Sequence, residues 1–120
     1  MAEFDFSQAL NDVEAKYSSI SKALDVDSLK ATIADLEKQA AEPGLWDDSE
    51  HAQQVTSKLS AAQSQLKRLQ AVEQRIEDTK TLIELGEEEG DADSMNEAQE
   101  ELGNIAHELD DMEAVSYTPL

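Results

Sequence analysis

The chain has 120 residues, enough for one domain or for part of a larger protein, and its 28 acidic and nine basic side chains give a formal net charge of −19. It contains no Cys, which excludes disulfides and thiolate metal sites. Contact with phosphate needs a positive surface, so this charge argues against direct binding to nucleic acid or to an anionic membrane. No apolar run approaches the roughly 18 residues of a membrane span, and the N-terminus lacks the features of a signal peptide. We therefore expect a cytoplasmic protein.

The composition predicts helices. Ala, Leu, Glu, Gln, Ser, Asp and Lys dominate, and only four Gly and two Pro interrupt them. The chain has too few large aromatic side chains to fill a thick core. Thin seams of aliphatic residues between helices can form without aromatic side chains. Nowhere do β-branched or aromatic residues alternate with polar ones over the length of a strand. We therefore expect an all-α fold.

A first helix is predicted from an N-cap at Ser7 or Asp12 to about Leu24. Apolar residues in this stretch recur at spacings of three and four, so they share one face of a helix. They are Leu10, Val13, Tyr17, Ile20 and Leu24.

A second, shorter helix is predicted from Asp27 or Ser28. It ends before Pro43, because the residue that precedes a proline is pushed away from the α region, and Gly44 then allows a turn. Its apolar stripe consists of Leu29, Ile33, Leu36 and Ala40.

A long third helix is predicted to begin at Asp47, Asp48 or Ser49 and to end where Gly86 and Gly90 flank a run of Glu. Its length of about 37 residues corresponds to about 55 Å at a rise of 1.5 Å per residue. The apolar seam runs through Ala52, Val55, Leu59, Ala62, Leu66, Leu69, Val72, Ile76 and Ile83.

A fourth helix is predicted to begin between Asp91 and Ser94, with a heptad-like seam. The seam residues are Met95, Ala98, Leu102, Ile105, Leu109 and Met112. Short connections favour antiparallel neighbours, so the third and fourth helices should form a hairpin, and the first and second should pack against the third helix. The predicted fold is an antiparallel bundle or coiled coil of about four helices over residues 1–113, followed by an irregular tail at 114–120.

The residues next to the candidate catalytic and metal-binding side chains do not match the patterns that those functions require. His51 and His107 suggest a histidine phosphotransfer domain, but neither is followed by the Lys that would hold the phosphoryl group. Asp91 and Asp93 resemble the start of a calcium loop, yet loop positions 5, 6 and 12 are not those of an EF-hand. We predict helix capping by these aspartates, two surface histidines, no metal or cofactor site and no enzyme activity in this chain.

The turn between the second and third helices contains the only Trp. Pro43, Gly44, Leu45 and Trp46 form this predicted structural turn. We expect Leu45 and Trp46 to fold back over the junction of the helices as an apolar plug. The alternative is a solvent-facing Trp with a role in recognition.

Residues 36–48, LEKQAAEPGLWDD, followed by AQQV at 52–55, resemble the N-terminal helical domain of bacterial class I peptide chain release factors, in particular the type that reads UAA and UGA. The resemblance covers roughly residues 1–113. It implies a role in stop-codon-dependent translation termination on the ribosome, as a domain that faces the large-subunit stalk base and a GTPase-type release factor. The family's Gly-Gly-Gln and Ser-Pro-Phe motifs are absent from these 120 residues, so we expect part of a longer factor.

The acidic residues are concentrated at the C-terminal end of the sequence. All nine Lys and Arg precede Thr81, whereas thirteen Asp and Glu follow Lys80. This segment either keeps a helical protein soluble or binds a basic partner such as a ribosomal protein. Glu87, Glu88 and Glu89 are the predicted partner surface. Apart from the release factor, an autonomous acidic coiled-coil adaptor or holdase remains open.

Overall fold

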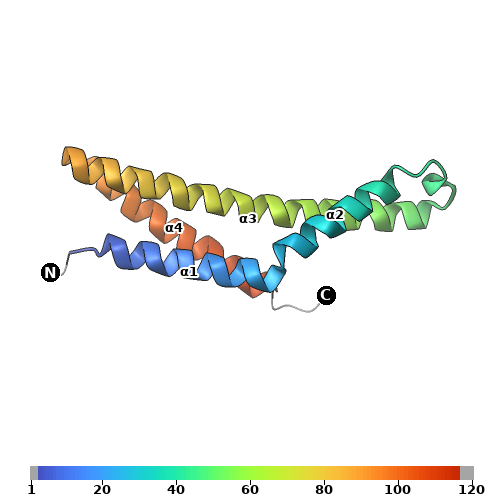
Figure 1. Cartoon of the computed structure of the whole chain (residues 1–120), viewed down its shortest axis with the longest axis horizontal. Helices are drawn as coiled ribbons and strands as arrows, with labels where there is room; N and C mark the ends of the chain where they lie inside the picture. Colours follow the sequence, from blue (N-terminus) through green and yellow to red (C-terminus); the bar gives the residue numbers. More distant parts are fainter. Residues whose placement is uncertain (1–2, 117–120) are drawn as a thin grey trace. The chain divides into compact units, whose positions relative to one another are not determined.

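The computed structural model describes residues 3–116, with the side chains of residues 3–114. Within this range the chain forms four α-helices and one 3-10 helix, and no strand. In order, they are α1 (Phe6–Leu24), α2 (Val26–Ala40), η1 (Leu45–Asp47), α3 (Ser49–Glu89) and α4 (Ala92–Ser116), as Figure 1 shows. The predicted all-α fold with a long third helix is confirmed.

The helices belong to two compact units. One unit combines the chain up to Ala23 with the chain from Ala71 onward, and the other comprises Leu24–Gln70. The first unit therefore contains α1, the C-terminal part of α3, and α4. The second contains α2, η1 and the N-terminal part of α3. Helix α3 has 41 residues and contributes to both units.

The first unit is a three-helix arrangement in which α3 and α4 are antiparallel, as predicted for the hairpin. Arg75 Nε lies 2.7 Å from Glu101 Oε1, and a Cβ added to Gly86 would meet Met95 of α4. Its buried residues are the seam positions of the three helices: Val13, Ile20, Val72, Ile76, Ile83, Ala98, Leu102, Ile105, Leu109 and Met112. The seam also contains Thr79, which is 2% exposed and donates its hydroxyl to the Arg75 carbonyl at 2.7 Å.

Polar contacts attach α1 to both neighbouring helices. Lys16 forms an ion pair with Asp110 of α4, and the Tyr17 hydroxyl donates a hydrogen bond to Glu73 Oε2 of α3. Partial burial, together with this bond to a carboxylate, raises the pKa of Tyr17 from 10.0 to about 12. The neutral phenol is therefore the form that the folded chain stabilises.

The second unit is a helical hairpin closed by a small apolar cluster. Leu36 of α2, Leu45 of η1, and Ala52 and Val55 of α3 are all buried together. Ala40 and Leu59 pack against them. The turn between the two helices is thus fixed by a side chain from the turn itself.

The first two helix starts differ from the prediction. The Asp5 carboxylate accepts from the Gln8 backbone N–H at 3.0 Å and caps α1, so the predicted caps Ser7 and Asp12 are wrong. Asp25, at φ 50°, caps α2 by accepting from the Ser28 N–H at 3.2 Å, ahead of the predicted start. In both cases the helix begins before its first predicted seam residue, in a turn that contributes no residue to the buried core.

Two helix ends also differ from the prediction. Of the two glycines predicted to mark the end of α3, only Gly90 does so: the helix continues through Gly86 to Glu89, and Gly86 is buried opposite Met95. Gly90, at φ 65°, provides the left-handed conformation that ends the helix. Helix α4 extends to Ser116, so the predicted irregular tail does not begin at 114, and its last part, 117–120, lies outside the described residues.

Candidate partner-docking site

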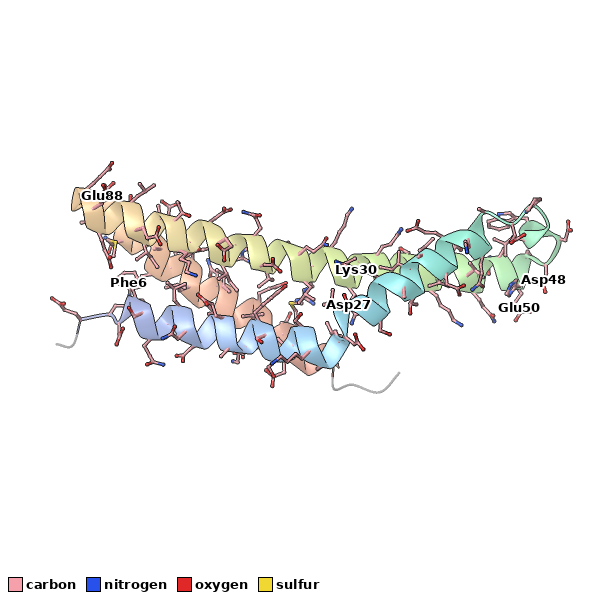
Figure 2. All side chains as sticks on the ribbon, in the orientation of Figure 1. Phe6, Asp27, Lys30, Asp48, Glu50 and Glu88 are labelled. Carbon is pink, nitrogen blue, oxygen red and sulfur yellow. The ribbon has the colours of Figure 1, made fainter. Side chains whose placement is uncertain are left out.

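The first candidate surface is the acidic last turn of α3. Glu87, Glu88 and Glu89 are all exposed, and this turn contains no basic residue. Figure 2 shows Glu88 at the end of the helix, directed outward. The C-terminal end of a helix carries partial negative charge and favours cations. Three adjacent carboxylates there are unfavourable for the helix itself, so the run is a candidate for a role outside folding.

Asp91, next to this turn, is occupied with capping α4. Its Oδ1 accepts from the backbone N–H groups of Asp93 at 3.1 Å and Ser94 at 3.3 Å, and its Oδ2 accepts from Ser94 Oγ at 2.8 Å. These hydrogen bonds, those from Ser94 above all, lower the pKa of Asp91. Helix capping, predicted for Asp91 and Asp93 in place of calcium binding, is confirmed for Asp91, whereas Asp93 lies in the first turn of α4 and its N–H donates to the cap. Among residues 3–116, no three His, Cys, Asp or Glu side chains gather in a way that could hold a metal ion.

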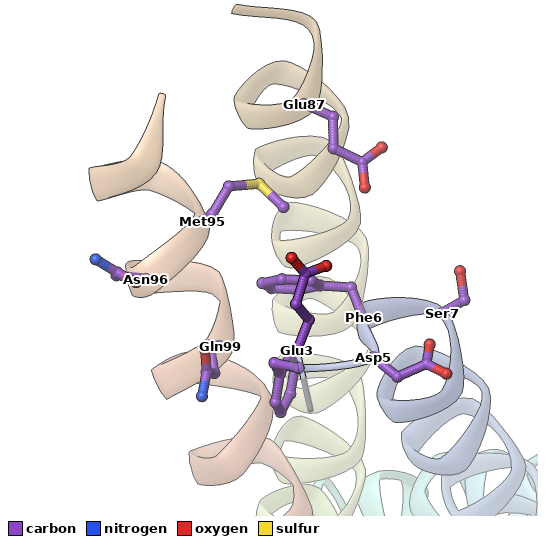
Figure 3. A pocket seen from close by; sticks show the side chains of 9 residues that line it. Glu3, Asp5, Phe6, Ser7, Glu87, Met95, Asn96 and Gln99 are labelled. Carbon is purple, nitrogen blue, oxygen red and sulfur yellow. The ribbon is translucent and has the colours of Figure 1, made fainter. Parts of the chain in front are cut away.

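An open groove of roughly 680 Å³ lies beside the acidic turn. Figure 3 shows Phe6 of α1 and Met95 of α4 directed into it, with Glu87 at its edge. The rings of Phe4 and Phe6 meet edge to face with centroids 4.8 Å apart, and Phe4 remains 39% exposed. Sequence reasoning missed this groove, because Phe4 and Phe6 precede the first periodic stripe.

The second candidate surface is the turn between α2 and α3, in the other unit. Pro43 and Gly44 are exposed. Leu45 is 6% exposed, as expected of a plug, but Trp46 is 64% exposed. The prediction that Trp46 packs over the junction is wrong. The short 3-10 helix aims consecutive side chains in different directions, and Leu45 occupies the apolar cluster beside Leu36 and Val55.

The family of the chain follows from comparison with known proteins. The PCRF domain matches residues 29–118, which include most of α2, the turn, and all of α3 and α4. The chain belongs to the PCRF domain family.

Relatives of this PCRF domain are named peptide chain release factor 2. The protein from Arthrobacter sp. (strain FB24) is 48% identical over 97% of the chain, and that from Pseudarthrobacter chlorophenolicus is 47% identical over 97%. The protein from Streptomyces avermitilis is 46% identical over 94% of the chain. The chain spans about a third of the length of these relatives, 31% of each. The resemblance to release factors, deduced from residues 36–55, is confirmed.

Other side chains of the PCRF domain that were considered for chemistry lie on its surface. His51, in the first turn of α3, and His107, in α4, are exposed, as expected for surface histidines.

In residues 3–116, no helix combines the length and the apolar character that crossing a membrane requires.

Proposed function

We propose that this chain is the ribosome-facing domain of a peptide chain release factor, and that it acts in stop-codon-dependent translation termination in the cytoplasm. The match of the PCRF domain to residues 29–118 carries this proposal. It is supported by relatives named peptide chain release factor 2 that align over almost the whole chain. Codon reading and peptidyl-tRNA hydrolysis are then tasks of the rest of the factor, and this domain catalyses nothing itself.

The proposed partners are basic protein at the base of the large-subunit stalk and a GTPase-type release factor. The acidic turn at Glu87, Glu88 and Glu89 supplies the charge for such contacts. A surface of one sign steers an oppositely charged partner over a distance set by the Debye length, about 8 Å at physiological salt. The groove beside Glu87, with Phe6 and Met95 in its lining, adds apolar area next to that charge.

The binding experiment uses the 120-residue chain and purified large ribosomal subunits. We expect the chain to sediment with the subunits at low salt, to be released as salt is raised, and to compete with an intact release factor. It should not release peptide from ribosomes at a stop codon. Failure to sediment at any salt concentration, or peptide release by the chain alone, would contradict the proposal.

A matched pair of variants tests the acidic turn. Glu87→Gln, Glu88→Gln and Glu89→Gln together should weaken ribosome binding by about tenfold, because three exposed charges are removed from the interface. The control removes three acids from α2 instead: Asp27→Asn, Asp35→Asn and Glu37→Gln. Equal weakening in both variants would indicate a general effect of net charge and would reject a specific role for the turn.

A further inference from the structure

Trp46 is the most exposed large apolar residue among the described ones. It is 64% exposed, compared with 49% for Leu85 and 39% for Phe4. Its neighbour Leu45 is buried, so the same short helix provides one side chain to the core and one to the solvent. Exposed Trp side chains of this kind are enriched at the centres of protein interfaces, where they contribute most of the binding energy.

The backbone holds Trp46 in place. The Leu45 N–H donates to the Glu42 carbonyl at 3.1 Å, the Asp47 N–H to the Gly44 carbonyl at 3.1 Å, and the Asp48 N–H to the Leu45 carbonyl at 3.4 Å. Together with the burial of Leu45, these bonds fix the turn from both sides. A side chain presented on such an ordered segment loses little conformational entropy when it binds.

The charge around Trp46 is negative. Glu42, Asp47, Asp48 and Glu50 are all exposed, and the sequence contains no Lys or Arg between Lys38 and Lys58. Figure 2 shows Asp48 and Glu50 at this turn. Asp48 accepts from the His51 N–H at 3.2 Å and so caps α3, as predicted. The other three carboxylates are not needed as helix caps.

We propose that Trp46, with the carboxylates of Glu42, Asp47 and Glu50, binds an arginine side chain in a basic segment of a protein partner. Indole is the best aromatic acceptor for a cation, and a guanidinium lies flat on its face while its edge N–H groups donate to carboxylates. The complementary charge selects a basic occupant, and the same carboxylates repel the phosphates of RNA. This surface belongs to the α2–α3 unit and does not include Glu87, Glu88 or Glu89.

The test exploits the fact that Trp46 is the only Trp in the chain. A capped hexa-arginine peptide is titrated into the 120-residue chain at low ionic strength, and both tryptophan fluorescence and the heat of binding are measured. We expect a saturable change in the emission of Trp46 with the same midpoint as the heat. Capped hexaglutamine should produce neither signal. Heat without a change in emission would place the peptide elsewhere and overturn the proposal.

Two matched pairs of variants separate this surface from general attraction to an acidic protein. Trp46→Ala should weaken hexa-arginine binding between about fivefold and thirtyfold, as loss of a cation–π contact implies. Leu85→Ala, which removes another exposed apolar side chain, should change it by less than about twofold. Calorimetry measures both, since it does not depend on the Trp, and circular dichroism confirms that the helices are retained.

The second pair compares charges. Neutralising Glu42, Asp47 and Glu50 to their amides should weaken binding several-fold more than neutralising Glu87, Glu88 and Glu89. Equal losses, or equal affinities for Trp46→Ala and Leu85→Ala, would reject the proposal. Because the ribosome experiment depends on the acidic turn of α3 and this one on Trp46, either proposal can fail without the other. Hexa-arginine bound less tightly than hexalysine would also count against a flat guanidinium on the indole.

Discussion

Leu45 and Trp46 are consecutive residues with opposite environments. Leu45 is 6% exposed and belongs to the cluster with Leu36, Ala52 and Val55, whereas Trp46 is 64% exposed. Truncating a buried leucine removes apolar contacts and leaves a cavity, whereas truncating an exposed side chain does neither. The smaller of the two residues therefore contributes more to folding.

We expect Leu45→Ala to lower the free energy of unfolding by about 2–4 kcal/mol, and Trp46→Ala to change it by less than about 0.5 kcal/mol. Urea unfolding followed by circular dichroism measures both, since it does not depend on the Trp. In the folded chain, Trp46 emission should resemble that of a solvated indole and respond freely to a quencher. A large loss of stability in Trp46→Ala would mean that Trp46 does pack over the junction of the helices, contrary to its exposure in the structure.

Tyr17 makes the free energy of unfolding depend on pH in the alkaline range. Its pKa is raised from 10.0 to about 12 by burial and by the hydrogen bond to Glu73. A raised pKa means that the folded chain holds the proton more tightly than the unfolded one. The stabilisation is therefore fully present below pH 10 and is lost as the pH rises toward 12.

Tyr17→Phe should lower the free energy of unfolding by about 1 kcal/mol at neutral pH, a value discounted for the partial exposure of the phenol. The difference from the unmodified chain should shrink between pH 10 and about 12. Lysine titrations affect both proteins equally, so they cancel in the comparison. A difference that stays constant through this range would show that Tyr17 ionises as freely in the folded state as in the unfolded one.

At the scale of elements, Gly86 and Gly103 are a natural comparison, because both lie inside helices of the same unit. A Cβ at Gly86 would lie 2.6 Å from Met95 Sδ and 3.2 Å from its Cγ, whereas a Cβ at Gly103 would meet nothing within 4 Å. Alanine improves helix propensity at both positions by about 1 kcal/mol. Only at Gly86 is this gain opposed by crowding between α3 and α4.

Gly103→Ala should therefore raise the free energy of unfolding by about 0.5–1 kcal/mol. Gly86→Ala should give no gain, or a loss of up to about 2 kcal/mol, since overpacking costs about 1–3 kcal/mol. Thermal or urea unfolding measures both. If the two substitutions stabilise equally, then Met95 moves aside without penalty and the close approach of α3 and α4 does not depend on Gly86.

The helices were predictable from the sequence because burying one face of a helix places apolar residues at a regular spacing of three and four along the chain. Every seam residue predicted in α4 except Met95 is buried, and the cluster around Leu36 and Val55 consists of predicted stripe positions together with Leu45 from the turn. Asp5 and Asp25 were missed as caps, since each depends on local backbone geometry outside the stripe. The exposure of Trp46 was missed for a related reason: hydrophobicity alone does not say which of two adjacent apolar residues a single turn can bury.

At the scale of the whole molecule, charge is divided unequally between the two units. The Leu24–Gln70 unit carries eight acids and five bases, and the rest of the chain carries 20 acids and four bases. Self-repulsion is therefore concentrated in the unit that contains the acidic turn of α3. Two effects can make these acidic residues destabilise the folded chain: repulsion among all its negative charges, and the local dipole of the helix. They predict different changes in stability when single charges are removed.

Asp27 and Glu88 distinguish the two effects. Both are exposed, and Figure 2 shows them on different helices: Asp27 in the first turn of α2, and Glu88 in the last turn of α3. Glu88→Gln should raise the free energy of unfolding, and Asp27→Asn should lower it, each by about 0.3–1 kcal/mol at low ionic strength. Both changes remove one negative charge, so relief of global repulsion alone would stabilise both variants.

Urea unfolding of the two variants, at low salt and again at about 1 M salt where the Debye length is about 3 Å, measures this difference. The opposite signs should be clear at low salt and should diminish at high salt. Stabilisation by Glu88→Gln together with weaker ribosome binding by the triple Gln variant would mean that the acidic turn lowers the stability of the domain and serves its contacts. Stabilisation of both variants would instead attribute the effect to net charge, and the acidic turn would no longer be distinguished from the rest of the surface.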